Sequence, residues 1–212
     1  FGVGPGNTVL DPFCGTGTTL VECKRRGVGS VGIEGTPMAH FASRVKLDWT
    51  PSPDGLYAHA REVAEEAFAE LEAAGFEDVP LFSLFRDQDE GLRALPPESA
   101  KLLLKDSISP RPLHKTLTLL DCIERNRDAR YYDHERLALA KALVTSISNL
   151  HFGPEVGVGP AKTDTPVLVQ AAPTIRAPRH DDVVVLQIPH GEARQSLVVF
   201  DQDGANWLMR HE

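Results

Sequence analysis

Residues 8–37, TVLDPFCGTGTTLVECKRRGVGSVGIEGTP, carry the clearest structural signal in this chain. Val9 and Leu10 end a short apolar run that predicts a buried strand. Asp11-Pro12 stops this strand, because proline cannot donate a hydrogen bond to a ladder. Two glycines, an amphipathic segment and a second apolar run ending at Ile33 follow. The pattern predicts a strand, a turn, a helix and a second strand of an α/β sheet.

The expected helix has recognisable ends. Thr18 and Thr19 can cap its first turn, and Gly27 can end it. Beyond it, Val31 and Ile33 predict a second buried strand. This order is typical of the first half of a parallel sheet.

Two carboxylates follow the predicted strands, Asp11 after the first and Glu34 after the second. Open α/β sheets bind ligands at the carboxyl ends of their strands, where an acid commonly holds the ribose hydroxyls of an adenosine. Gly15 and Gly17 would let such a ligand approach the backbone closely. Taken singly, Asp11 could be a turn former and Glu34 a solvated loop acid. Their placement together favours a pocket for an adenosine-containing ligand.

The glycine spacing narrows the class of ligand. A dinucleotide site requires a third glycine for close packing of helix and strand, and Leu20 occupies that position. A P-loop requires G-x-x-x-x-G-K-[ST], and the chain has no such string. Both NAD and ATP are therefore disfavoured.

The string Asp11–Thr19, DPFCGTGTT, resembles motif I of the S-adenosylmethionine-dependent DNA amino-methyltransferases. These enzymes methylate the exocyclic amine of adenine (N6) or cytosine (N4). Gly32–Pro37 and Ala39–Lys46 continue the resemblance, and Ser148–Glu155 forms a thinner second patch. RNA amino-methyltransferases share a close variant of the motif. The resemblance implies S-adenosylmethionine as cofactor, DNA as partner and a Rossmann-like sheet.

The resemblance also implies roles for individual residues. Asp11 and the motif glycines would line the methionine and sulfonium end, and Glu34 would hold the ribose. Residues 36–38 would lie near the adenine. The cofactor-binding residues implied in this way are Asp11, Phe13, Gly15, Gly17, Thr18, Glu34, Thr36 and Pro37.

The catalytic loop of that family is not found in the chain. The family uses an (Asp, Asn or Ser)-Pro-Pro-(Tyr or Phe) loop, whose polar groups accept the amine protons and whose ring stacks on a flipped base. The chain's Pro-Pro pair lies in Leu95–Glu98, LPPE, which has neither group. Asn206 and Trp207 offer an amide beside an aromatic ring, but no prolines shape the turn. We therefore assign no catalytic residue, and expect either a fragment of a methyltransferase or a noncatalytic module that binds S-adenosylmethionine.

We expect an α/β fold with an incomplete Rossmann-like methyltransferase sheet and a mostly helical insertion. Residues 1–51 would form the cofactor-binding βαβα segment, 52–150 the helical insertion, and 151–212 a Gly/Pro loop with returning strands. The expected helices cover 37–49, 56–74, 111–126 and 132–150. Helical spacing predicts an apolar face on each of the last three, formed by Val63, Ala67 and Leu71, by Leu113, Leu117 and Leu120, and by Leu137, Val144 and Ile147. Strands at 183–186 and 197–200 would rejoin the sheet. Loop 190–194 resembles a family loop that places an acid, here Glu192, near the adenine.

Charge and composition limit the alternatives. The net charge is −8, and residues 54–98 hold twelve acidic but only three basic residues. The basic spots elsewhere could contact phosphates or be solvated faces: Arg111 with Lys115, Arg125 with Arg127 and Arg130, and Arg176 with Arg179. Three cysteines without a C-x-x-C pair and scattered histidines predict neither disulfides nor a metal site. This cysteine usage suits a reducing cytoplasm, which is the expected location. No apolar run is long enough to predict a membrane span.

Overall fold

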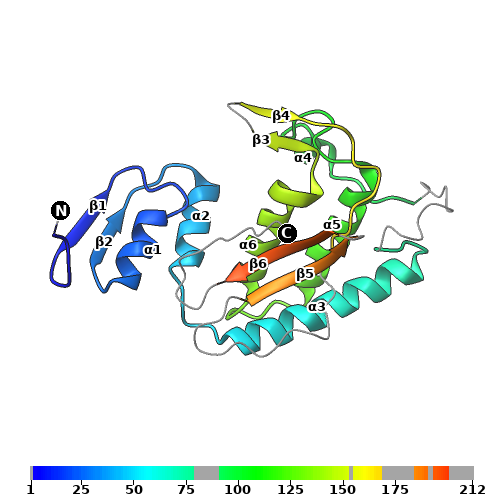
Figure 1. Cartoon of the computed structure of the whole chain (residues 1–212). Helices are drawn as coiled ribbons and strands as arrows, with labels where there is room; N and C mark the ends of the chain where they lie inside the picture. Colours follow the sequence, from blue (N-terminus) through cyan, green and yellow to red (C-terminus); the bar gives the residue numbers. More distant parts are fainter. Residues whose placement is uncertain (1, 79–90, 153–154, 169–183, 191–192, 201–212) are drawn as a thin grey trace. The chain divides into compact units, whose positions relative to one another are not determined.

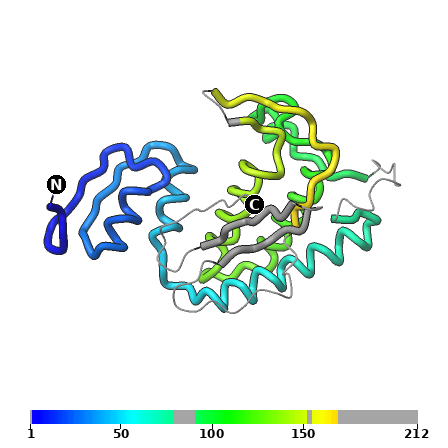
Figure 2. Tube along the Cα trace, viewed as in Figure 1, coloured from blue at the N-terminus to red at the C-terminus, as the bar shows by residue number. Residues whose placement is uncertain are grey.

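The computed structural model describes residues 2–78, 91–152 and 155–168, and the backbone of 184–190 and 193–200 (Figure 1). The chain divides into two compact units. One comprises residues 1–58 and 172–212, and the other residues 59–171. Figure 2 traces the backbone of both.

The N-terminal segment contains the predicted strand–helix–strand–helix order. Its elements are β1 (Thr8–Asp11), α1 (Thr18–Arg25), β2 (Gly29–Gly32) and α2 (Pro37–Lys46). β1 and β2 pair in parallel, with Thr8 opposite Gly29 and Asp11 opposite Gly32. Because parallel strands share their direction, the loops that follow both strands leave the same edge of the sheet.

Burial of the two strands is one-sided, which corrects the prediction of two buried strands. Helix α1 buries Leu20, Val21 and Cys23. Leu10 is 62% exposed, and Val31 and Ile33 are also largely exposed. A central strand of a parallel sheet is apolar because both of its faces are covered. In this two-stranded sheet only one face is covered.

The start of α1 also differs from the prediction. Gly17 is the N-cap residue, with φ of 85°, and no side chain caps the helix. Thr18 is instead the first helical residue, so neither Thr18 nor Thr19 acts as a cap. The other end is as predicted, with Gly27 at φ of 65° immediately beyond the last turn.

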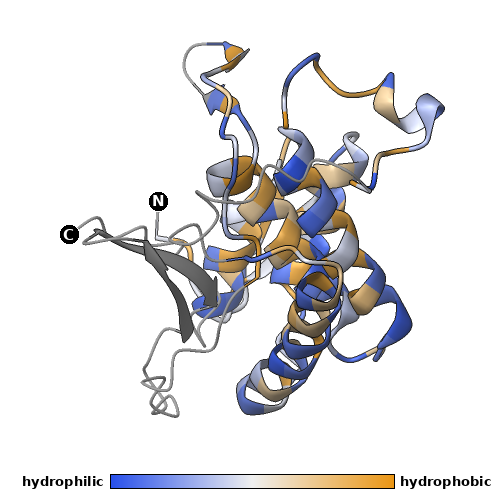
Figure 3. Ribbon diagram, turned by 90° about the vertical axis from the view of Figure 1, so that its right-hand side faces the viewer, coloured by the Kyte–Doolittle hydropathy of each residue, from blue (hydrophilic) through white to orange (hydrophobic). Residues whose placement is uncertain are grey.

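Most of the second unit consists of helices. The long helix α3 (Pro53–Ala73) starts within the first unit, and Gly75 follows its end at φ of 82°. Val63, Ala67 and Leu71 are buried, which confirms the predicted apolar face. Helices α4 (Pro97–Ala100), α5 (Pro110–Arg125) and α6 (Tyr132–Ala142) follow. Figure 3 shows hydrophobic and hydrophilic residues interspersed along the helices.

The predicted apolar stripes of α5 and α6 need correction. On α5, Leu113, Leu117 and Leu120 are only partly buried, and the buried positions include four polar residues, His114, Lys115, Thr116 and Thr118. After α6 the chain continues as a π-helical turn, η2 (Leu143–Ile147), rather than as an α-helix to residue 150. The wider turn changes the register of the side chains. Val144 is consequently exposed while Ile147 is buried.

Two hairpins complete the described structure and correct two further expectations. Residues 151–162, expected as a Gly/Pro loop, contain part of an antiparallel pair of β3 (Leu150–Phe152) and β4 (Val156–Val158). β5 (Val184–His190) and β6 (Ala193–Phe200) pair with each other. In the part of the chain that the structure describes, the strands therefore form three two-stranded sheets, and β5 and β6 do not join β1 and β2.

None of the helices in the described ranges is both long enough and apolar enough to cross a membrane.

Candidate functional site

The loop after β1 is held in place by backbone hydrogen bonds to the segment after β2. The Ile33 N–H donates to the Asp11 carbonyl at 2.9 Å, and the Cys14 N–H donates to the Ile33 carbonyl at 3.1 Å. The Asp11 carboxylate accepts the Phe13 N–H at 3.2 Å. The two segments that carry the predicted carboxylates are thus adjacent at one edge of the sheet.

Glu34 lies where these two segments meet. Its carboxylate accepts the Thr36 N–H at 2.7 Å. The pKa of Glu34 is lowered, first by this backbone N–H, then by the Thr36 hydroxyl, and further by the backbone of Gly15 and Gly35. The carboxylate therefore stays ionised, and it faces the glycine loop that follows β1.

The two motif glycines serve different purposes. Gly15 has φ of 54°, and a Cβ atom built on it would meet nothing within 4 Å. Gly17 has φ of 85°, but a Cβ atom there would lie 2.6 Å from Cβ of Ser43 on α2. Gly15 therefore borders open space in which a ligand could approach the backbone, whereas Gly17 lets α2 pack closely against the start of α1.

Leu20, which occupies the third-glycine position of a dinucleotide motif, packs against β2. A Cβ atom on Gly32 would lie 2.5 Å from Cδ1 of Leu20 and 2.8 Å from Sγ of Cys14. Close packing of helix and strand is achieved here by a glycine on the strand rather than on the helix. No packing role was predicted for Gly32 or Ser43, although a glycine inside a strand is a known sign of close approach.

The remaining predicted residues line the same edge. Thr36 is the N-cap of α2, and Pro37 is its first residue. Thr18 is exposed at the start of α1. Phe13 is 89% exposed, so its ring projects into solvent rather than into the core. The structure brings Glu34 together with Gly15 and Thr36, while Gly17 is buried under α2. Glu192, Asn206 and Trp207 lie outside the described residues.

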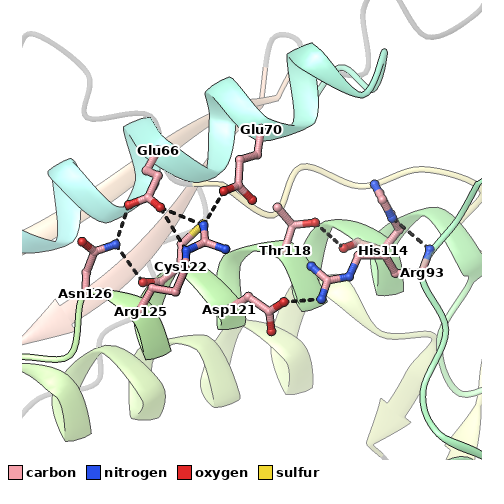
Figure 4. Close-up of polar contacts among 9 residues, drawn as sticks. All are labelled: Glu66, Glu70, Arg93, His114, Thr118, Asp121, Cys122, Arg125 and Asn126. Atoms are coloured by element: carbon pink, nitrogen blue, oxygen red, sulfur yellow. Dashed lines mark hydrogen bonds and ion pairs between the residues drawn. The ribbon is translucent and has the colours of Figure 1, made fainter.

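The basic spots of the helical unit are largely neutralised by acids, which limits their use as phosphate contacts. Arg125 on α5 pairs with Glu66 and Glu70 on α3 (Figure 4). Arg130 pairs with Asp128 at 2.6 Å. Arg127 lies with its guanidinium carbon 4.3 Å from the Tyr132 ring centroid. The sequence left open whether these arginines form a solvated face. Arg125 and Arg130 are exposed, but both are ion-paired with acidic side chains.

Lys115, expected at a basic surface spot, is instead buried. Its side chain is 1% exposed, and Nζ lies 2.6 Å from Asp164 and 3.6 Å from Asp78. Asp78 also accepts the N–H groups of Val167 and Leu168 at 2.8 Å. This cluster is a structural tie, because it connects α5 to two segments distant in sequence.

One group of potential metal ligands occurs in the described residues. Ligand atoms of Glu66, Glu70 and Cys122 lie within 4.8 Å of one another. Nη2 of Arg125 hydrogen-bonds all three (Figure 4). The guanidinium therefore already supplies the positive charge that a cation would bring.

The comparisons with known proteins concern the N-terminal segment. The DNA methylase family matches residues 2–40. This segment of the chain is therefore similar to the DNA methylases. The match covers β1, α1, β2 and the start of α2, which is the segment that carries the Gly15 loop and Glu34.

Two curated relatives match the same part of the chain. Type II methyltransferase M.BsoBI of Geobacillus stearothermophilus is 46% identical over 46 residues, which is 22% of this chain and 9% of that protein. Type II methyltransferase M.MjaII of Methanocaldococcus jannaschii is 45% identical over 42 residues, 20% of this chain and 8% of that protein. The aligned segments thus span less than a tenth of either relative. No solved structure matches the chain significantly.

Proposed function

We propose that this chain provides the S-adenosylmethionine site of a DNA amino-methyltransferase that acts on N6 of adenine or N4 of cytosine. Within it, residues 1–51 form the cofactor-binding segment of a Rossmann-like sheet, and residues 52–150 an insertion. The observation that carries the proposal is the arrangement at the ends of β1 and β2, where backbone hydrogen bonds hold the loop after β1 against Ile33, beside Glu34, and where Gly15 borders open space. The family match over residues 2–40 supports a methyl-donor site at this place.

The residues present fit S-adenosylmethionine. Open space beside Gly15 leaves the backbone accessible, and an ionised Glu34 can accept hydrogen bonds from both ribose hydroxyls. Asp11 offers a second carboxylate at the same edge for the positively charged end of the ligand. When bound, the cofactor would supply an electrophilic methyl group, while Glu34 and Asp11 would orient it.

The acceptor half of the reaction requires residues that we do not assign. An exocyclic amine needs hydrogen-bond acceptors for its protons, and a duplex base must first be flipped out of the stack. We therefore assign binding and orientation of the methyl donor to this chain. A noncatalytic module that binds S-adenosylmethionine is the second candidate, because the chain's Pro-Pro pair, LPPE at 95–98, is flanked by leucine and glutamate and not by a polar and an aromatic residue.

Calorimetric titration with S-adenosylmethionine tests whether the chain binds this cofactor, which both candidate functions require. We expect the wild-type chain to bind and Glu34→Gln to bind at least ~10-fold more weakly, since the lost contact is charge-assisted. Glu22→Gln is the matched control, because Glu22 pairs with Arg25 and Arg26 on the surface of α1. No binding by the wild-type chain, or equal affinity of wild type and Glu34→Gln, would refute the proposal.

Transfer of a labelled methyl group to DNA and to RNA then separates the candidates. Transfer to an adenine or cytosine amine of DNA identifies the methyltransferase, and transfer to RNA identifies an RNA amino-methyltransferase. Binding without any transfer identifies the noncatalytic module.

A further inference from the structure

Residues 96–106, PPESAKLLLKD, are exposed without a break, although the chain is anchored on either side of them. Before them, the Arg93 N–H donates to Nδ1 of His114 on α5 at 3.0 Å. At their end, Nδ2 of Asn149 donates to the Asp106 carbonyl at 2.9 Å. We call this segment the 96–106 arm, because it leaves the helical unit and returns to it between two fixed points.

The arm has a defined backbone. Helix α4 (Pro97–Ala100) forms its first part, and the Leu102 N–H donates to the Ser99 carbonyl at 3.1 Å. Asp106, its last residue, has φ of 61°, a left-handed conformation that no other non-glycine residue in the described part of the chain adopts. Asn149, which is buried, holds this turn from the interior. The residues before the turn are therefore presented to solvent by an ordered support.

The arm presents three consecutive leucines. Leu102 is 86% exposed, Leu103 45% and Leu104 54%. Exposure of apolar side chains to water is unfavourable, and a contiguous apolar patch at a surface is typical of an interaction site. These leucines are therefore candidates for contact with a partner.

The charges beside the leucines indicate what kind of partner fits. Lys101 and Lys105 flank them, and both are exposed. Lys105 forms no ion pair with any residue that the structure describes. Lys101 pairs with Glu98 at 2.8 Å, but an exposed pair of this kind contributes little and can be exchanged for another anion. The remaining acid, Asp106, lies at the anchored end of the arm.

Duplex DNA offers partners to both kinds of side chain. Its phosphates attract lysines, and its stacked bases admit apolar wedges, leucine among them, that open a base step. We propose that the 96–106 arm contacts DNA, with Leu102 and its neighbours entering between base pairs and Lys101 and Lys105 contacting the flanking phosphates. This inference rests on the proposed function, in which DNA is the methyl acceptor. A wedge would assist that function, because the target base must leave the stack.

Fluorescence anisotropy of the full chain with a labelled DNA duplex tests the leucines. The double variant Leu102→Ala/Leu104→Ala should weaken binding by roughly fivefold to twentyfold, because less apolar surface is buried. Val144→Ala is the matched control, since Val144 is also an exposed apolar residue of the helical unit, and it should bind as wild type does. The melting temperatures of both variants should equal that of wild type, because the altered side chains are exposed.

Two further measurements separate the wedge from simple charge attraction. Lys105→Gln should lower the slope of log affinity against log salt by about one, whereas the leucine variant should leave the slope unchanged. Unstacking costs least at a mismatched base. Wild type should therefore bind a duplex with a central mismatch more tightly than the matched duplex, and the leucine variant should lose this preference.

The outcomes distinguish this inference from the proposed function. S-adenosylmethionine binding, measured by calorimetry, should be equal in wild type and the leucine variant, and its absence from both would refute the proposed function. Cofactor binding by wild type without DNA binding, or equal DNA affinity and mismatch preference in wild type and the leucine variant, refutes the arm's role alone. A leucine variant that differs from wild type only in self-association during sedimentation also refutes it, because the leucines would then join two copies of the chain.

Discussion

The imidazole of His59 and the carboxylate of Glu135 meet at 2.6 Å, Nδ1 to Oε1, between helices α3 and α6. Nε2 of His59 lies 3.0 Å from the carbonyl oxygen of Asn126. A carbonyl can only accept, so Nε2 carries a proton. When the pair binds a second proton, that proton lies in the short contact between Nδ1 and Glu135.

The surroundings of this pair fix the direction of its titration. Burial acts to lower the pKa of His59, but Glu135, the Asn126 carbonyl and Asp128 together raise it above its ordinary value of 6.5. Burial raises the pKa of Glu135 more than His59 lowers it. The Tyr131 ring packs 5.4 Å from the imidazole, and the second Glu135 oxygen is buried without a partner. Because the pKa values of His59 and Glu135 are both raised, the folded state binds protons more tightly than the unfolded state.

The chain should therefore lose stability as the pH rises past neutrality. A raised histidine pKa gives a contribution that is complete below pH 6.5 and is lost as the pH rises through the folded value. We expect the free energy of unfolding from urea titrations to fall between pH 6.5 and 8.5 by more in wild type than in His59→Gln. His151→Gln, at an exposed position, is the control and should follow wild type. Parallel curves for wild type and His59→Gln would contradict the assignment.

Lys115→Met should destabilise the helical unit strongly. Removing the ammonium leaves the carboxylates of Asp78 and Asp164 unpaired in the interior, and breaking a buried pair in this way costs about 3–5 kcal/mol. Burial raises the pKa of Asp78, so its protonation removes the unpaired charge as the pH falls. The loss measured by urea denaturation should accordingly be smaller at pH 5 than at pH 7.5.

The matched control for Lys115→Met is Arg125→Met on the same helix. Arg125 is exposed and pairs with Glu66 and Glu70 on the surface, where ion pairs contribute little and are screened by salt. We expect only a small loss of stability, which added salt reduces further. Equal losses for the two variants would show that the buried cluster around Lys115 is not a specific tie.

The contrast between α3 and α5 shows how far the sequence predicts this fold. The apolar face of α3 follows from its helical spacing, because Val63, Ala67 and Leu71 pack as such residues ordinarily do. On α5 the same rule failed, since Lys115 and His114 are buried with partners far away in sequence, Asp164 and the N–H of Arg93. Spacing alone cannot reveal such partners.

The candidate site was more predictable than its packing. Asp11 and Glu34 follow from strand ends and motif spacing, and the structure places their segments together. The contact between Gly17 and Ser43 could not be foreseen, because it depends on how α2 approaches α1 in three dimensions. The hairpin partners of β5 and β6 were missed for the same reason, since strand propensity does not specify which strand is the neighbour.

Gly17→Ala should destabilise the N-terminal segment more than Gly15→Ala. Both positions have positive φ, which costs an L-residue about 1–2 kcal/mol. Only at Gly17 does the added methyl group also collide with Cβ of Ser43. Ser43→Gly in the same chain should recover the steric part of the loss but not the backbone part. Thermal unfolding followed by circular dichroism measures the differences, and equal losses for the two alanine variants would contradict the packing.

Cys122 should be the least reactive thiol in the native chain. Burial, followed by the nearby Glu70 carboxylate, raises its pKa to about 11, and the residue is fully buried on α5. At pH 8 only about one molecule in a thousand would carry the thiolate, which is the nucleophilic form. We therefore expect that a maleimide will modify Cys122 in 6 M guanidinium but not in buffer, as mapped by mass spectrometry of tryptic peptides. Cys14 and Cys23, which are nearly as buried on the N-terminal segment, serve as internal comparisons. Rapid labelling of Cys122 in buffer would mean that α3 and α5 separate readily, and that the ion pairs of Arg125 do not keep the two helices together.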